Sequence, residues 1–150
     1  HACAAARRRA LILAAAEAQG LARAALGATC AYLAERRQFG QPIIRFQAIR
    51  HRLVELHIRE QELGAMLAAA CTVYDDEGPG LDETLWRLRA QSARTALSIT
   101  GQAIQLHGGM GMTCELPVGR HYARALLLDG LFGSYREAVA ALAETLPLPG

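Results

Sequence analysis

The sequence predicts an all-α protein that folds as an antiparallel four-helix bundle. Alanine makes up about a fifth of the 150 residues and aromatic residues only 5%. Alanine and leucine are strong helix formers, and the β-branched and aromatic residues that favour strands are sparse. Apolar residues make up 52% of the chain and mean hydropathy is +0.12, which indicates a packed core. We therefore expect one helical domain over residues 1–150 and no strand.

The first predicted helix runs from about residue 4 to residue 37. Its apolar residues recur at three- and four-residue spacing and form one helical face. These residues are Leu11, Ala14, Ala18, Leu21, Ala25, Ala28 and Tyr32. Glycine and proline within residues 38–42 are expected to end this helix.

The second and third predicted helices span about residues 44–74 and 82–106. The second carries an apolar stripe with near-heptad spacing that only Glu60 interrupts. An exposed turn follows it, and Asp82 is a plausible N-cap for the third helix. Three long helices followed by one or two short ones indicate an antiparallel four-helix bundle.

Two glycine-containing breaks divide the last part of the chain. The first covers residues 107–113 and the second covers residues 130–133. Between them we expect a shorter helix over residues 117–128, and after them a helix over residues 134–144. Prolines exclude a helix from the last five residues, 146–150.

Charge and cysteine content narrow the class of protein. The net charge of +2 is too small to indicate a nucleic-acid partner. The cluster Arg7–Arg9 interrupts the apolar start, so we expect no signal peptide and no membrane span; the cluster is a solvated helix face or a phosphate contact. The cysteines, Cys3, Cys30, Cys71 and Cys114, are far apart, which favours free thiols and a cytoplasmic protein.

Common catalytic and metal motifs are missing from the sequence. No histidine follows a glutamate at the Glu-x-x-His spacing that a di-iron bundle requires, and His51 and His57 are interpreted as polar surface residues. No His/Cys group has zinc-ligand spacing, and no Gly-x-Ser-x-Gly occurs. We therefore predict no bound metal.

Two local features could bind an anion. Gly108–Gly111 resembles a phosphate-binding loop in composition but lacks the strand that precedes such loops. It is interpreted either as a turn between two helices or as a segment whose backbone, without Cβ atoms, lets a flat or charged ligand come close. Arg36 lies at a predicted helix C-terminus, where it could grip a pyrophosphate or satisfy the helix dipole.

Three motifs in order make the chain resemble one family. They are Arg36-Arg37-Gln38-Phe39-Gly40, then Phe46-Gln47, and later Gln105-Leu106-His107-Gly108-Gly109-Met110-Gly111. Together they resemble the C-terminal helical domain of the acyl-CoA dehydrogenase flavoenzymes, over essentially the whole chain. The resemblance implies that this chain is the C-terminal piece of a longer flavoprotein, without the family's N-terminal helical domain and middle β-domain.

The resemblance implies a set of FAD contacts. Arg36 and Gln47 would contact the FAD of a neighbouring subunit, and Gln105 to Gly109 would line its adenine-ribose end. Ser134 and Arg136 would lie against the flavin nucleotide, with arginine where the family has a glutamate or glutamine. The implied cofactor-binding residues are Arg36, Phe39, Gln47, Gln105, His107, Gly108, Gly109, Ser134 and Arg136.

The family's reaction, oxidation of acyl-CoA to 2-enoyl-CoA, needs a carboxylate base near the α-carbon. Gapless alignment places Phe132 at one family position for this base and Ala10 at the other. The family's CoA-side arginine falls on Leu11. Three interpretations follow: Asp129, one helical turn before Phe132, is the base; the chain is a non-catalytic partner subunit; or other domains or an unlike partner supply the base.

The predicted protein is thus an FAD-dependent acyl-CoA dehydrogenase family member whose isolated chain is inactive. Its expected partners are an acyl-CoA substrate, an electron-transfer acceptor and further subunits in a homo- or hetero-oligomer. Leu131-Phe132-Gly133 resembles a bacterial subgroup associated with pimeloyl-type or sterol side-chain substrates. A purely structural bundle is the alternative; an acyl-CoA oxidase also remains open, and a DNA-binding protein ranks last.

Overall fold

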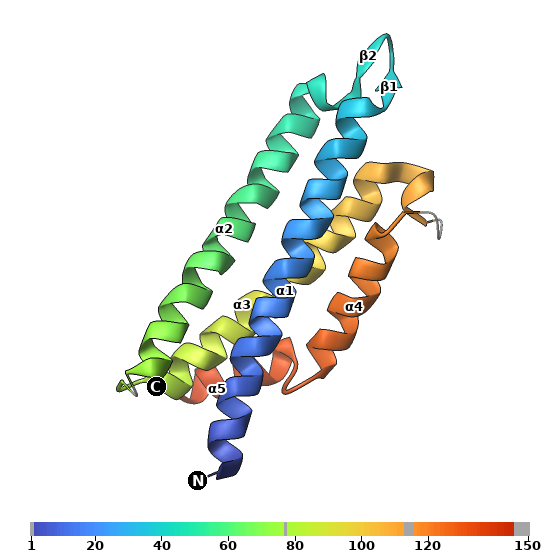
Figure 1. Ribbon diagram of the computed structural model, residues 1–150. Helices are drawn as coiled ribbons and strands as arrows, with labels where there is room; N and C mark the ends of the chain where they lie inside the picture. Colours follow the sequence, from blue (N-terminus) through green and yellow to red (C-terminus); the bar gives the residue numbers. More distant parts are fainter. Residues whose placement is uncertain (1, 77, 113–115, 146–150) are drawn as a thin grey trace.

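A computed structural model describes residues 2–76, 78–112 and 116–145 (Figure 1). The described part contains five α-helices, two short strands and two 3₁₀ turns. In chain order these are α1 (Ala2–Glu35), β1 (Arg37–Gln38), β2 (Gln41–Pro42), η1 (Ile43–Arg45), α2 (Gln47–Asp75), α3 (Leu81–His107), η2 (Gly108–Met112), α4 (Val118–Gly130) and α5 (Tyr135–Thr145). The all-α fold predicted from the sequence is confirmed.

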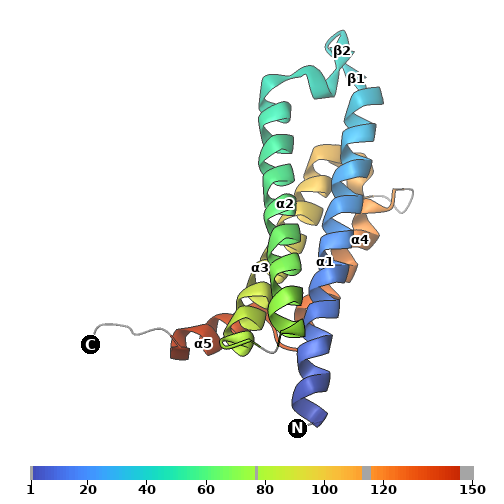
Figure 2. The same ribbon diagram turned by 60° about the vertical axis from the view of Figure 1, so that its left-hand side comes forward.

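Helices α1 to α4 run alternately up and down and form an antiparallel bundle, and α5 lies across one end (Figures 1 and 2). Helix α3 contacts each of the other four helices, and α1 most extensively. We call the end that carries β1, β2 and η2 the hairpin end. The opposite end, with the α2–α3 turn, the α4–α5 loop (131–134) and α5, is the loop end.

The core is built from alanine on α1 and larger aliphatic residues on its partners. Ala15, Ala18, Ala22 and Ala25 are almost completely buried, so neighbouring helices can approach α1 closely. The larger buried side chains on α2 and α3 include Leu56, Leu63, Leu88 and Ile99. By length and composition alone α1 could cross a membrane, but within the described chain it packs along α2, α3 and α4.

The short hairpin corrects the expectation of no strand. Arg37 pairs with Pro42 and Gln38 with Gln41, in antiparallel register. Phe39 and Gly40, between them, both have positive φ, of 51° and 80°. This is the backbone of a tight two-residue hairpin turn, which sequence reasoning missed because Phe-Gly lacks the usual Asn-Gly signature.

One further expectation changes in the structure. Gly80, at φ 78°, is the N-cap of α3, whereas Asp82 lies in the first turn and pairs with Arg8. Glu60 is buried on α2, and Arg23 on α1 donates a hydrogen bond to it. The predictions for Thr113, Cys114 and residues 146–150 lie outside the described residues.

Candidate functional site

A cavity at the hairpin end brings together five of the nine implied cofactor-binding residues, namely Arg36, Gln105, His107, Gly108 and Gly109. Its volume is about 440 Å³. The lining residues come from the end of α1, the hairpin, η1, the end of α3 and η2. They are Tyr32, Arg36, Gln38, Ile43, Gln105, Leu106, His107, Gly108, Gly109 and Met110.

Arg36 is held at the junction between α1 and the hairpin by its backbone. Its N–H donates to the carbonyl of Tyr32 at 2.8 Å, and its carbonyl accepts from the N–H of Ile43 at 2.9 Å. None of the ion pairs found among the described residues involves its guanidinium. An arginine of this kind beside open space can bind a phosphate through two parallel hydrogen bonds.

His107 is almost completely buried at the last position of α3. Its Nδ1 lies 2.7 Å from the carbonyl oxygen of Ala103, and its ring stacks on Tyr32 with centroids 4.4 Å apart. A carbonyl oxygen can only accept, so Nδ1 must carry a proton. In the neutral imidazole the other nitrogen, Nε2, is then left as a hydrogen-bond acceptor for a ligand.

Glycine backbone forms the floor beside His107. Gly108 has φ 62°, and a Cβ added at Gly108 or at Gly109 would meet no protein atom within 4 Å. Bare backbone therefore faces open space, which allows a flat or charged ligand to approach closely. Gly111 differs, because its Cβ would lie 2.5 Å from the carbonyl oxygen of Ile104.

Phe39 and Gln47 do not line this cavity. Phe39 is 90% exposed at the hairpin tip and contacts Phe46 edge-to-face. Gln47 is exposed at the first position of α2. Tyr32 was missed as a lining residue, although its position one helical turn before Arg36 places both on one face.

Ser134 and Arg136 lie at the loop end. The hydroxyl of Ser134 accepts from the N–H of Glu137 at 3.2 Å, and the carboxylate of Glu137 accepts from the N–H of Ser134 at 2.6 Å. This reciprocal capping box starts α5, and its hydrogen bonds hold the pKa of Glu137 below its usual value. Arg136 is exposed.

Asp129 also has a structural partner at the loop end. Its Oδ1 accepts a hydrogen bond from the N–H of Tyr135 at 2.9 Å and lies 3.9 Å from the guanidinium of Arg89. Its carboxylate therefore links the end of α4 to the start of α5. The assignment of Asp129 as a catalytic base stays a prediction.

Ala10 and Phe132, the residues expected at the family's two base positions, lie at the same end of the bundle. Leu11, next to Ala10, lines a cavity of about 250 Å³ together with Trp86. A Cβ added at Gly133, next to Phe132, would lie 3.3 Å from the ring of Trp86. Trp86 therefore connects the two chain segments on which the family's alternative bases would fall.

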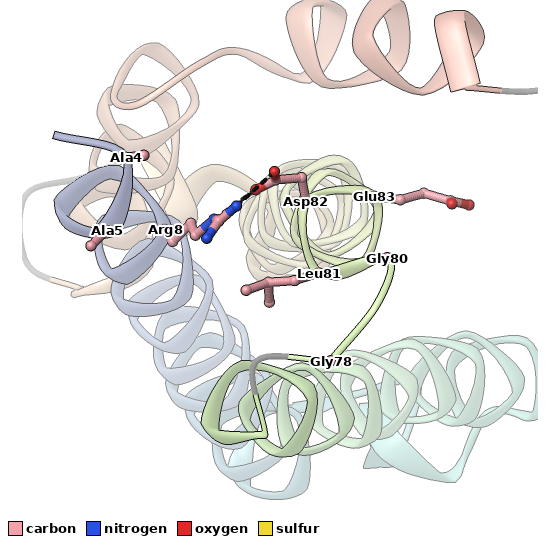
Figure 3. A pocket seen from close by; sticks show the side chains of 8 residues that line it. All are labelled: Ala4, Ala5, Arg8, Gly78, Gly80, Leu81, Asp82 and Glu83. Atoms are coloured by element: carbon pink, nitrogen blue, oxygen red, sulfur yellow. Dashed lines mark hydrogen bonds and ion pairs between the residues drawn. The ribbon is translucent and has the colours of Figure 1, made fainter. Parts of the chain in front are cut away.

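The largest cavity described lies at the loop end between α1 and the start of α3 (Figure 3). It measures about 590 Å³. Arg8 points into it and forms two hydrogen bonds of 2.8 Å with the carboxylate of Asp82. These bonds, with the nearby positive charges, lower the pKa of Asp82. Two of the charged residues that line this cavity, Arg8 and Asp82, are thus paired with each other.

Metal and disulfide chemistry find no support in the described residues. No group of three or more His, Cys, Asp or Glu side chains there could hold a metal ion. Cys3, Cys30 and Cys71 are free thiols, and burial raises the pKa of Cys30.

Comparison with known proteins places these features in one family. Residues 6–145 match the family described as acyl-CoA dehydrogenase, C-terminal domain. The chain is 36% identical over 134 residues to acyl-CoA dehydrogenase IpdE2 of Mycolicibacterium smegmatis, covering 89% of this chain and 41% of the relative. The chain therefore spans well under half the length of this relative.

Solved structures show the same fold. The steroid acyl-CoA dehydrogenase Tcur3481-Tcur3483, as its G363A variant, superposes with a TM-score of 0.84 at 26% identity, covering 89% of this chain and 37% of that one. A glutaryl-CoA dehydrogenase from Mycobacterium smegmatis in complex with FADH2 superposes with a TM-score of 0.85 at 22% identity, covering 91% of this chain and 35% of that one.

Proposed function

This chain belongs to the acyl-CoA dehydrogenase family as its C-terminal domain, and from that membership we propose that it is the FAD-binding and subunit-assembly domain of a flavoprotein that oxidises acyl-CoA to 2-enoyl-CoA. The observation that carries the proposal is the cavity at the hairpin end. It combines an arginine, a buried histidine and bare glycine backbone in one place. This set of groups fits the adenosine and pyrophosphate half of FAD.

Each group in the cavity would have a separate role toward FAD. The guanidinium of Arg36 would bind the pyrophosphate, and Gly108 and Gly109 would let the adenosine lie against backbone. Nε2 of His107 would accept a hydrogen bond from an adenine amine or a ribose hydroxyl. Gln105 would add an amide at the same edge.

The two groups of implied cofactor residues lie at opposite ends of the bundle. Arg89, beside the α4–α5 loop, and His107 are 18 residues apart on α3, or about 27 Å along a helix. We propose that Arg36 and His107 serve the adenosine half of one FAD, and that Ser134 and Arg136 face another. Each FAD would then be shared between subunits, so a dimer or tetramer, of like or unlike chains, is required to complete a site.

The proton-abstracting group is proposed to come from outside this chain. FAD supplies, when bound, the acceptor for the β-hydride, and a carboxylate must take the α-proton. Phe132 and Ala10 cannot do so, and Asp129 is already hydrogen-bonded. A non-catalytic partner subunit of a hetero-oligomeric dehydrogenase is the form that these vacancies favour, with Asp129 as the alternative base within the chain.

The family also suggests the substrate class, the electron acceptor and the cellular location of the protein. The similarity to acyl-CoA dehydrogenases, among them a short-chain specific enzyme of Bos taurus, supports an acyl-CoA substrate. Electrons would pass from the flavin to an electron-transfer acceptor, and free thiols support a cytoplasmic location. The isolated chain should bind FAD weakly, because the flavin ring needs the family's β-domain.

FAD and FMN titrations of the assembled protein test the cavity, because FMN lacks the adenosine half. Arg36→Leu should weaken FAD binding at least about tenfold and FMN binding less, because FMN keeps only one of the two phosphates. His107→Asn, which keeps only the Nδ1-like donor, should weaken FAD binding more than His107→Gln, which keeps an acceptor near Nε2. Arg52→Leu, an exposed change on α2, is the control. Equal FAD affinity in wild type and Arg36→Leu would contradict the proposal.

A further inference from the structure

Arg89 is a buried arginine that the FAD site does not use. Its side chain is only 1% exposed, and it belongs to the buried face of α3 together with Leu85 and Leu88. Burial lowers the pKa of its guanidinium, and the charges of Asp129 and Glu137 partly offset this effect. A charge is costly to bury unless its hydrogen bonds are satisfied. The hydrogen-bond partners of Arg89 therefore indicate its role in the fold.

The partners of Arg89 are backbone carbonyls around the end of α4 and the α4–α5 loop. Its Nε donates to the carbonyl oxygen of Gly133 at 2.7 Å. One terminal nitrogen, Nη2, donates to the carbonyl oxygens of Leu128 at 2.6 Å, Asp129 at 3.0 Å and Leu131 at 3.3 Å. The last carbonyls of a helix have no partner within the helix. One guanidinium thus both caps α4 and binds the loop that follows it.

The loop is held in a conformation that it would not adopt freely. Phe132 has φ 60°, a left-handed value that a bulky residue rarely takes, and Gly133 has φ 105°. A Cβ at Gly133 would press on Trp86, and Arg7 lies over the ring of Trp86 at 4.6 Å. Leu131 and Phe132 remain exposed. A strained loop with an exposed aromatic side chain is typical of a binding surface.

We propose that Arg89 is the positioning residue of the α4–α5 loop, holding it against Trp86 so that Leu131 and Phe132 form a preformed apolar edge for the acyl end of the substrate. This inference rests on the proposed function for the identity of the ligand. The residue acts through backbone carbonyls and does not touch the substrate. The site lies at the loop end, away from the cavity for the adenosine half of FAD.

Trp86 reports on the loop directly, because Gly133 lies against its ring. It is the single tryptophan of this chain, and a Trp86→Phe variant gives the emission that other domains or subunits of the assembled protein contribute. Arg89→Met keeps much of the side-chain volume but removes every donor, so the loop should leave the indole. In the assembled, FAD-loaded protein we expect red-shifted Trp86 emission, about twofold more acrylamide quenching, and about tenfold weaker butyryl-CoA binding. FAD affinity should stay within about twofold of wild type, since the adenosine cavity is remote.

Two variants make the outcome decisive. Arg89→Lys keeps the charge but cannot reach all four carbonyls from one ammonium, so it should show smaller changes in the same direction, and it serves where Arg89→Met does not fold. Arg94→Met, exposed on the same helix, should change nothing. Wild-type emission, quenching and butyryl-CoA affinity in a folded Arg89 variant would overturn the inference. A wild-type protein that binds no butyryl-CoA would instead contradict the proposed function, and the Trp86 signal would still test Arg89.

Discussion

At the scale of single residues, hydrogen-bond geometry distinguishes roles that residue type alone leaves open. His107 and His121 illustrate this. His107 is anchored through Nδ1 to a backbone carbonyl, so its remaining nitrogen is available to a ligand. His121 has a buried Nδ1 without a hydrogen-bond partner among the described residues. The first arrangement is suited to binding, whereas the second costs stability.

His121 gives a prediction for pH dependence. Burial, followed by the charge of Arg120, lowers the pKa of His121. The unfolded chain therefore takes up a proton at about pH 6.5, before the folded chain does, and folding stability falls as pH decreases through the window below this value. In His121→Gln the loss of stability between pH 7 and pH 5, measured by urea unfolding, should be smaller than in wild type. Equal losses would contradict this reading.

Ser134 and Asp129 show how structure refines a motif. The sequence placed both near a flavin or a reacting carbon, but their side chains hold the start of α5 and the end of α4. For Ser134, capping does not exclude binding, because a capping hydroxyl keeps a free lone pair. The roles that were expected for them stay predictions.

At the scale of helices, a buried polar contact joins α1 to α2. The carboxylate of Glu60 accepts from Arg23 at 2.9 Å, from Gln19 at 3.3 Å and from Gln61 at 2.6 Å. Each partner satisfies part of a carboxylate that is otherwise removed from water. A single polar contact of this kind can fix how two alanine- and leucine-rich helices align along each other.

Removing Arg23 should therefore expose the cost of burying Glu60. Arg23→Ala should lower the free energy of unfolding by about 1–2 kcal/mol, measured in urea, because the carboxylate loses its charged donor. Glu60→Gln in the same chain should recover part of this loss, since an amide is less costly to bury. Strict additivity of the two single changes would show that the two residues do not interact.

Helix periodicity and breakers predicted the elements well. The segments 44–74 and 82–106 match α2 and α3 within three residues at each end, because long apolar stripes and glycine breaks are strong local signals. The hairpin and the burial of Arg89 escaped prediction. Phe-Gly is not a typical hairpin turn, and the carbonyls that satisfy Arg89 come from residues about 40 positions later in the chain.

At the scale of the whole molecule, the two ends of the bundle have different chemistry. The hairpin end offers Arg36, His107 and bare glycine backbone. The loop end offers Trp86, Phe132 and an apolar edge held by Arg89. Arg36 and the segment from Gln105 to Gly109, which are distant in the sequence, meet at the hairpin end.

The position of FAD in the assembled protein tests this account most directly. A structure with FAD bound should show the pyrophosphate at the guanidinium of Arg36 and the adenosine against Gly108 and Gly109, with a second subunit supplying the rest of that site. FAD whose adenosine lies outside the hairpin-end cavity, for example in the loop-end cavity of Arg8 and Asp82 (Figure 3), would contradict it.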